Sequence, residues 1–365
     1  MHVSTIKPEY FREYLKGREI MRRQTLEQQF GEEVIAYLSQ YADLADPGTE
    51  VLITSESFNV EVMNVNALHT FINLKRINDI SEPNEFFRQV NRKLPKGGYY
   101  IGCVETIKLR RKRILAKFHN LISYPYYFFD FIIKRIFPKL KPTRKIYSIL
   151  TRDVNRVMSL TEALGRLTAC GFEVNEVKDI GYSCFFVCHK VEPALDQETT
   201  NYGIFIKLKR VGKDGRLFNV YKFRTMHPYA EYLQGYVHGQ NNLADGCKFN
   251  NDFRITSWGR VMRKLWIDEL PMLINLFRGE MKLVGVRPLS EQYFELYPEE
   301  LQQQRTRNKP GLVPPFYADL PVTFDELLES ERKYLEAYEK SPWLTDFKYF
   351  WAAWINIIFR KARSA

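Results

Sequence analysis

The 365-residue chain is 45% hydrophobic and 27% charged, with a net charge of +11, so it holds enough apolar material for two globular domains. Its five cysteines show no CxxC pair and no Cys/His ligand spacing, which argues against a disulfide framework and a zinc site and favours a reducing compartment. Residues 1–10 lack the apolar core of a signal peptide.

The first half of the chain alternates predicted helices and strands. Helical patterns cover 8–45 and 83–94, and short apolar runs at 50–54, 70–74 and 99–104 predict buried strands. Ser159 followed by Glu162 predicts a capped helix that ends at Gly171, with closing strands at 172–174 and 184–188. This alternation predicts an α/β domain with three layers over 1–195.

Residues 85–190 resemble the later half of a class I methyltransferase domain, which has a Rossmann-like fold. The residues that carry the resemblance are Phe86-Phe87, L-P-K-G-G-Y-Y-I at 94–101, Ala163-Leu164 and C-G-F-E-V at 170–174. That family binds its methyl donor through a glycine-rich turn after the first strand, and this chain has no such turn. We therefore expect a degenerate domain without a cofactor; a working methyltransferase is the alternative.

One window carries the whole charge imbalance. Residues 108–145 hold twelve Lys/Arg and a single acid, Asp130, and the middle of the window, 121–133, is aromatic and apolar. We interpret 106–146 as an insertion in the first domain. At roughly 13 residues the apolar stretch is shorter than the ~20 that a membrane-spanning helix needs.

Basic flanks around an aromatic centre suit an element that lies on an anionic membrane surface. The alternative is a solvated pair of basic helices whose aromatic side chains pack on the domain core. Nucleic acid is not expected as a partner, because the charge comes without a recognisable binding motif.

The second domain is predicted at 196–365, after the polar stretch 196–201. Alternating runs at 204–211 and 217–224 flank Asp214-Gly215, a dipeptide that tolerates positive φ in a tight turn, so they predict a β-hairpin. Lys222 and Arg224 share one face of its second strand. Solvated surface lysines are the alternative to a role in binding.

Asp268 and Glu269 form an adjacent carboxylate pair just before Pro271. Because proline disfavours a helical residue before it, we expect the helix of 256–266 to end there and a new one to begin at 270–278. A helix start offers free N–H groups, which hold phosphate and keep a carboxylate ionised. Simple capping of the helix by Asp268 is the alternative.

Residues 203–317 resemble the catalytic domain of bacterial sugar transferases, the polyprenyl-phosphate hexose-1-phosphate transferases. The matching blocks are K-R-V-G-K at 209–213, Y-K-F-R-T-M at 221–226, D-F-R-I-T at 252–256, G-R-V-M-R-K at 259–264, D-E-L-P at 268–271, Asn275, G-E-M-K-L-V-G at 279–285, R-P-L at 287–289 and K-P-G at 309–311. The fold that the two resemblances imply is a methyltransferase-like domain plus a smaller α+β sugar-phosphate transferase domain.

The resemblance implies transfer of a sugar-1-phosphate from a nucleotide diphosphate sugar to polyprenyl phosphate, with Mg²⁺, at the cytoplasmic face of the inner membrane. Asp268 would be the nucleophile that forms a phosphosugar-aspartyl intermediate, and Glu269 would hold Mg²⁺ with it. The expected substrate-binding residues are Arg263, Arg287, Lys222, Arg224, Asp252 and Arg254. Asp252 and Arg254 could instead form a buried ion pair, and the whole chain could instead be a non-catalytic scaffold for glycan-assembly enzymes.

The chain departs from the family in two places. The family's hydrophobic hairpin has no counterpart before residue 203, so we expect peripheral or monotopic attachment. Gly285-Val286-Arg287-Pro288 stands where the family has Gly-Pro-Arg-Pro.

At the C-terminus, apolar residues from Phe347 to Ile358 follow the spacing of one helical face. That amphipathic helix would either pack on the catalytic domain or dip into a bilayer surface.

Overall fold

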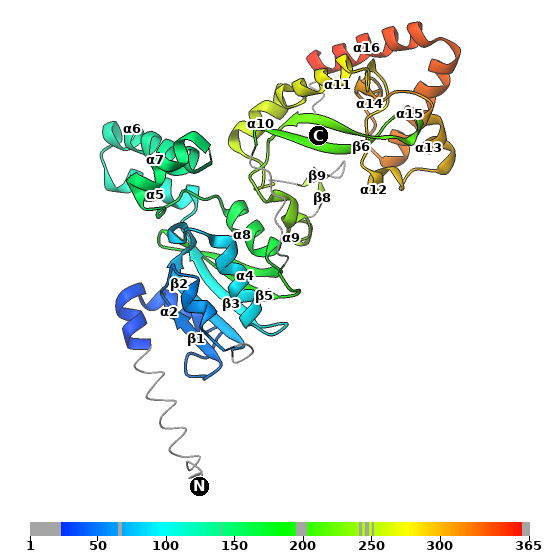
Figure 1. The fold of residues 1–365 in the computed structure, drawn as a ribbon. Helices are drawn as coiled ribbons and strands as arrows, with labels where there is room; N and C mark the ends of the chain where they lie inside the picture. Colours follow the sequence, from blue (N-terminus) through cyan, green and yellow to red (C-terminus); the bar gives the residue numbers. More distant parts are fainter. Residues whose placement is uncertain are drawn as a thin grey trace. The chain divides into compact units, whose positions relative to one another are not determined.

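The computed structural model describes residues 23–64, 68–139, 141–194, 203–240, 243–244, 248–249 and 252–359. The chain divides into two compact units (Figure 1). The first unit comprises Met1–Thr200 and Pro228–Tyr236, and the second comprises Asn201–His227 and Val237–Ala365. The sequence analysis placed the boundary after residue 195 and did not anticipate the return of Pro228–Tyr236 to the first unit.

The first unit is built on a mixed five-stranded sheet with the strand order β1-β2-β3-β5-β4. The strands are β1 (Thr49–Leu52), β2 (Thr70–Arg76), β3 (Tyr99–Val104), β4 (Phe172–Ile180) and β5 (Ser183–Lys190). The first three pair in parallel, whereas β5 runs antiparallel to both β3 and β4. Each of these strands overlaps one of the five runs that the sequence predicts.

Helices cover both faces of this sheet. The helical elements are α2 (Glu32–Leu38), α3 (Phe58–Glu61), η1 (Ile77–Asp79), α4 (Pro83–Lys93) and α8 (Leu160–Ala169). Ile72 and Ile101 pack in one core with Leu38 of α2. The strand residues next to them, Phe71 and Tyr100, contact the aromatic rings of α4 on the opposite face. The α/β, three-layer prediction for the first unit is confirmed.

The returning segment is anchored to the first unit by Tyr229. Its side chain is fully buried, its hydroxyl contacts the Asn84 amide at 2.5 Å, and the Arg166 guanidinium lies 4.6 Å from the centre of its ring. The segment forms η5 (Ala230–Leu233) and the start of α9 (Gln234–Gln240). Gly165 of α8 is required there, because a Cβ would lie 2.3 Å from the Tyr229 carbonyl oxygen. Sequence patterns do not reveal a contact of this range.

The basic window forms a helical insertion after β3, made of α5 (Ile107–Lys117), α6 (Asn120–Phe131), η2 (Ile132–Ile136), η3 (Phe137–Lys139) and α7 (Lys141–Thr151). Figure 1 shows these helices as one cluster of the first unit. Arg110 and Asp130 are both buried, and the guanidinium donates to the carboxylate through two nitrogens at 2.6 and 2.8 Å. Arg110 also donates to Glu105 at 2.8 Å, which ties α5 and α6 to the end of β3.

The second unit is an α+β arrangement around the predicted hairpin, β6 (Phe205–Val211) and β7 (Leu217–Phe223). Asp214 and Gly215 take φ values of 57° and 70° in the turn, as the dipeptide predicts. The other strands of this unit are the pair β10 (Lys282–Val284) and β11 (Gly311–Val313), together with the two-residue strands β8 (Leu243–Ala244) and β9 (Lys248–Phe249). The helical elements are η4 (Lys213–Gly215), α10 (Ser257–Lys264), η6 (Ile267–Met272), α11 (Leu273–Phe277), α12 (Glu291–Phe294), α13 (Glu299–Thr306), α14 (Phe316–Asp319), α15 (Phe324–Lys340) and α16 (Pro342–Phe359).

The C-terminal pattern forms α16, whose Ala353 and Asn356 are buried, whereas Phe347, Trp351 and Ile358 are exposed. The helix therefore packs on its unit along one side and presents apolar side chains along another. Within the described residues, no helix combines the length and the apolar character needed to cross a bilayer.

We predict that Asp130→Asn destabilises the helical insertion by about 3 kcal/mol, because it removes one of the two carboxylates that compensate the buried Arg110 guanidinium. Burial alone would raise the pKa of Asp130, but hydrogen bonds from Arg110 and Lys134 lower it below its ordinary value. The stabilisation is therefore present above the pKa of the unfolded carboxyl group and is lost as the pH falls below it. Hydrogen exchange of α5 and α6 measures the effect.

The matched control is Arg144→Gln, which breaks an exposed ion pair of the same insertion, Arg144 to Glu82 at 3.5 Å, and should change stability by less than about 1 kcal/mol. Equal effects of the two changes would contradict a structural role for the buried pair.

Candidate functional site

The hairpin register brings two cations to one face. Arg210 of β6 pairs with Phe218, and Ile206 pairs with Lys222 of β7. Because side chains alternate along each strand, Arg210, Val220 and Lys222 all point to the same side of the hairpin. The register around the Asp214-Gly215 turn could have revealed Arg210 from the sequence, but Arg210 was not among the predicted site residues.

The break before the carboxylate pair occurs at Trp266, which has a left-handed φ of 62°. The helix expected over 270–278 is observed in part: the 3₁₀ segment η6 begins at Ile267 and includes Pro271, and the α-helix α11 covers Leu273–Phe277. Asp268 and Glu269 therefore lie in the first turn of a six-residue 3₁₀ segment. So short a 3₁₀ element has little macrodipole, so it gives the Asp268 carboxylate less electrostatic support than the α-helix start that the sequence led us to expect.

Asp268 is held in an environment that favours its protonated form. Its side chain is 5% exposed, and its Oδ1 atom is buried with no hydrogen-bond partner in the described structure. Burial and the adjacent Glu269 charge raise the pKa of Asp268, while Lys222 and Arg263 act in the opposite direction. A carboxylate held in this way gains from a cationic ligand or from a phosphate that brings its own cation.

Glu269 is paired with Lys222, whose Nζ lies 2.7 Å from its Oε1. The contact depends on Asn275 of α11, which is fully buried. Its amide donates to the Asn219 carbonyl and accepts from the Tyr221 N–H, so it fastens α11 to β7. These two hydrogen bonds keep the carboxylates of η6 beside Lys222 of the hairpin.

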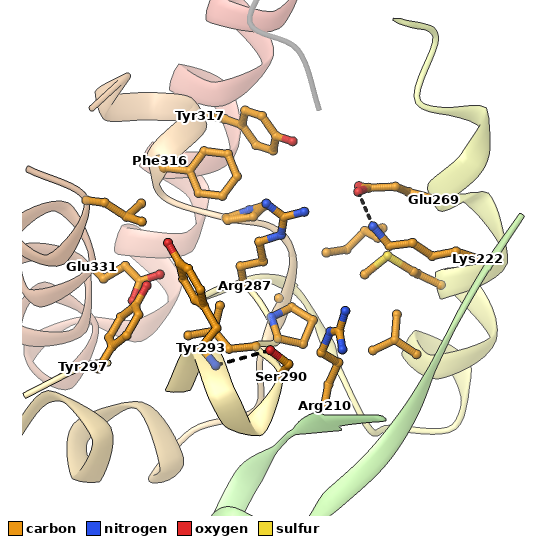
Figure 2. A pocket seen from close by; sticks show the side chains of 18 residues that line it. Arg210, Lys222, Glu269, Arg287, Ser290, Tyr293, Tyr297, Phe316, Tyr317 and Glu331 are labelled. Carbon is orange, nitrogen blue, oxygen red and sulfur yellow. Dashed lines mark hydrogen bonds and ion pairs between the residues drawn. The ribbon is translucent and has the colours of Figure 1, made fainter. Parts of the chain in front are cut away.

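A cavity of about 330 Å³ opens beside this pair. Figure 2 shows Lys222 and Glu269 on one wall, Tyr293, Tyr297 and Glu331 on the opposite wall, and Arg287 between them. Arg210 and Ser290 lie at another side, and Phe316 and Tyr317 complete the lining. The cavity combines three cations with aromatic rings and hydroxyl groups, a lining that suits a phosphorylated ligand with an organic part.

Arg210 and Arg287 reach the cavity in different surroundings. Burial and the nearby Arg287 charge lower the pKa of Arg210. Arg287 follows β10, where a Cβ on Gly311 would lie 2.0 Å from the Gly285 nitrogen, so only glycine permits this close approach of the two backbones. Like charges crowded at one cavity are stabilised when an anion binds between them.

The other predicted site residues lie elsewhere. Arg263 donates to the Thr225 hydroxyl at 3.0 Å, and its charge acts on Asp268. Arg224 donates to the Gly203 carbonyl at 3.0 Å and is not part of the cavity lining. Asp252 and Arg254 are buried and joined by several hydrogen bonds, the shortest 2.7 Å, which is the geometry of the alternative structural role. Their role in substrate binding stays a prediction.

Sequence reasoning missed the aromatic and hydroxyl wall. Tyr293 and Tyr297 pack edge-on against Phe324, and the Arg287 guanidinium lies 5.9 Å from the Phe316 ring centre. Tyr317 packs on Trp266 with a centroid distance of 4.4 Å, which places it near η6. These aromatic residues come from α12, the segment after it, α14 and α15, and only the folded chain brings them together.

The carboxylates fit a magnesium ion in one respect. Mg²⁺ is commonly held by one or two carboxylates together with substrate phosphates, and Asp268 has a buried oxygen without a partner. In the part of the chain that the structure covers, no group of three or more His, Cys, Asp or Glu forms a site of protein ligands alone. The fit therefore depends on phosphate oxygens from a ligand.

A family model described as bacterial sugar transferase matches residues 183–360, which confirms the resemblance found in the sequence. The galactosyl transferase CpsE of Streptococcus agalactiae is 35% identical over 133 residues, covering 35% of this chain and 29% of that protein. The exopolysaccharide production protein ExoY of Rhizobium meliloti is 38% identical over 115 residues, covering 30% and 50%. The undecaprenyl-phosphate galactose phosphotransferase of Salmonella typhimurium is 37% identical over 110 residues, covering 29% and 23%. The chain thus spans half or less of the length of these relatives.

Solved methyltransferases are also similar to this chain. An S-adenosylmethionine-dependent methyltransferase from Mesorhizobium loti is 10% identical, with a TM-score of 0.22, and the match covers 36% of this chain and 66% of that one. Human N-acetylserotonin methyltransferase is 10% identical, with a TM-score of 0.25, covering 44% and 45%. Similarity at this level says nothing about ligands or activity.

We predict that Arg210→Met weakens the binding of inorganic pyrophosphate by about tenfold, because it removes one of three cations around the cavity. Isothermal calorimetry on the full chain measures the affinity. Arg216→Met is the matched control, since Arg216 is an exposed arginine at the turn of the same hairpin. Equal affinities of the Arg210 and Arg216 variants would show that the anion binds elsewhere.

Proposed function

We propose that this chain, whose residues 183–360 belong to the bacterial sugar transferase family, is a phosphoglycosyltransferase that moves a sugar-1-phosphate from a nucleotide diphosphate sugar to polyprenyl phosphate. Such a step would initiate the assembly of a surface glycan. The observation that carries the proposal is the ion pair of Glu269 and Lys222, which lines a cavity with three cations. The buried Asp268 stands next to Glu269 in the chain and outside the lining of that cavity. Relatives named as sugar phosphotransferases support the same reaction class.

The reaction would run in two displacements at phosphorus. In the first, an Asp268 carboxylate oxygen attacks the sugar-bearing phosphorus, and the bond to the nucleoside monophosphate breaks, with the electron pair leaving on that product. In the second, an oxygen of polyprenyl phosphate attacks the same phosphorus and releases Asp268 as a free carboxylate. The product is a polyprenyl diphosphate sugar, and every bond broken is matched by one formed.

The cations would stabilise the negative charge of this reaction. Lys222 and Arg287 line the cavity and can contact the diphosphate, and Arg210 adds a third charge. The positive charge of Arg263 acts to lower the pKa of Asp268, so it favours the ionised carboxylate that the attack requires. Arg224, Asp252 and Arg254 would support the reaction indirectly, by stabilising the segments that surround the cavity.

Asp268 and Glu269 would hold Mg²⁺ together with the substrate diphosphate. The ion would supply neutralisation of phosphate charge. The Lys222 contact keeps the Glu269 carboxylate at the cavity wall, where it can take part.

Because the proposed acceptor is a lipid, the reaction would take place at a membrane. An anionic membrane surface would be a further binding partner of the chain. The exposed apolar residues of α16, among them Trp343, Phe347 and Trp351, give the catalytic unit an apolar face for this contact. We propose peripheral or monotopic attachment at the cytoplasmic face of the inner membrane. Nucleic acid is not a proposed partner.

We predict that Asp268→Asn lowers transfer from a nucleotide diphosphate sugar to polyprenyl phosphate by at least about a thousandfold, because the amide cannot act as the nucleophile. A radiolabelled assay with Mg²⁺ over a panel of nucleotide sugars measures the loss. In the parent chain without acceptor, mass spectrometry should find a sugar-phosphate adduct on the peptide that contains Asp268.

Asp325→Asn, at an exposed carboxylate of α15, should transfer at the parental rate. Full turnover by a folded Asp268→Asn variant would remove the nucleophile. Absence of transfer by the parent chain with every donor would instead favour a non-catalytic scaffold.

We predict that kcat/KM of the parent chain falls as the pH is lowered. The midpoint of this fall should lie at a higher pH than the pKa of an ordinary aspartate, since burial and Glu269 raise the pKa of Asp268. Glu269→Gln removes a negative charge and leaves Lys222 unpaired. Both effects lower the pKa of Asp268, so the acid limb should move to lower pH, whatever the change in maximal rate. With Glu295→Gln, at an exposed carboxylate, the limb should stay in place; an unmoved limb in Glu269→Gln would exclude Asp268 as the titrating group.

A further inference from the structure

The helix α6 has an inside-out distribution of side chains. A helix at a protein surface normally buries its apolar face and exposes its polar face. In α6, Ser123 and Asp130 are buried, whereas Leu121 is 81% exposed, Phe128 60% and Phe129 61%. Leu121, Tyr124 and Phe128 follow each other at helical spacing, so they form one continuous outward face.

The inward polar face explains why this helix is stable in that orientation. Asp130 accepts two hydrogen bonds from Arg110 and lies 2.9 Å from the Lys134 Nζ, so its charge is compensated inside the unit. Arg135 pairs with Glu162 of α8 and donates to the Val157 carbonyl at 2.9 Å. The apolar face is therefore held outward by a buried ionic framework, and it does not pack on the domain core as the alternative interpretation of the sequence supposed.

Exposed cations surround this face. Those of the insertion that are exposed are Lys108, Arg111, Lys112, Lys117, Arg144 and Lys145. Asp130, the single acid between residues 108 and 145, is buried. Lys108 and Arg144 pair with Asp179 and Glu82 outside the insertion, so its positive outer charge comes mainly from Arg111, Lys112, Lys117 and Lys145. On α7, Lys145 lies one helical turn from Ile149, so cations and exposed aliphatic side chains share the surface.

We propose that α5, α6 and α7 form a docking surface for an anionic lipid bilayer. The apolar face of α6 enters the boundary between headgroups and acyl chains, and the cations contact lipid phosphates. The described residues hold no helix long and apolar enough to cross a bilayer, and α6 continues into η2 with the cations Lys134 and Arg135, so we place α6 in the membrane plane. The first unit, which lies largely before the sugar transferase match, thereby contributes a membrane contact of its own.

Two other partners fit the surface less well. A second copy bound through the same face would bring Arg111, Lys112, Lys117 and Lys145 against the same cations of its partner, since a twofold interface pairs each patch with itself. Single-stranded nucleic acid would find cations and aromatic rings, but Leu121, Ile146 and Ile149 offer no ring for base stacking. Acyl chains accept aliphatic and aromatic side chains alike.

The test uses the full chain and vesicles without polyprenyl phosphate, so it is independent of transfer. We expect co-sedimentation with vesicles of phosphatidylcholine and about one-third phosphatidylglycerol, weaker binding to phosphatidylcholine alone, and loss of the difference at high salt. Lys112→Glu with Lys145→Glu should weaken binding to the anionic vesicles by about 25-fold or more. Phe128→Ser with Phe129→Ser should weaken it by about tenfold or more.

Matched controls in the same unit are Lys96→Glu and Phe58→Ser, at an exposed lysine and at a phenylalanine that is 67% exposed; both should bind as the parent does. Thermal unfolding and circular dichroism of every variant should match the parent. Because α16 offers a second apolar face, a polarity-sensitive label on Leu121→Cys reports on α6 itself, with the labelled parent chain as background. Its emission should shift to the blue on addition of anionic vesicles.

Unchanged binding of both double variants together with an unresponsive label would overturn the proposal. Self-association that is lost in Phe128→Ser with Phe129→Ser, without vesicle binding, would assign the face to a second copy and overturn it as well. Binding of single-stranded RNA without vesicle binding would do the same.

Discussion

The candidate site depends on one electrostatic constraint, the burial of two adjacent carboxylates beside a hairpin lysine. Without Lys222, Asp268 and Glu269 would place two like charges in a poorly solvated position. The constraint couples elements that are distant in sequence, because Lys222 comes from β7 and the carboxylates from η6. Asn275 keeps η6 and β7 in place relative to each other through hydrogen bonds to Asn219 and Tyr221 of β7.

The same principle shapes the first unit, with a different result. Arg110, Asp130 and Glu105 satisfy one another in the interior of the helical insertion, so the polar side of α6 faces inward. Buried charge is costly unless it is paired and hydrogen-bonded, and here it is both. The consequence is an apolar outer face that a soluble domain does not need. Charge burial thus organises an anion site in one unit and an exposed apolar surface in the other.

Much of the architecture could be predicted because it rests on local signals. The five strands of the first unit follow from apolar runs, and the hairpin turn follows from Asp214-Gly215. The helix predicted at 270–278 is shortened to Leu273–Phe277, because a 3₁₀ segment accommodates Pro271 after the reversal at Trp266. Neither the return of Tyr229 to the first unit nor the cavity wall of Tyr293 and Tyr317 has a local signal, since both depend on packing between distant segments.

By itself, the sequence determined the two-part organisation, the resemblance of the second part to bacterial sugar transferases and the carboxylate pair with most of its cations, because these depend on residue type and order. The tertiary structure decided which of the cations meet. It brought Lys222, Arg287 and Arg210 to one cavity and paired Arg254 with Asp252 away from it. It also decided that the aromatic residues of the basic window face outward, since only the folded chain shows which side of a helix has found buried partners.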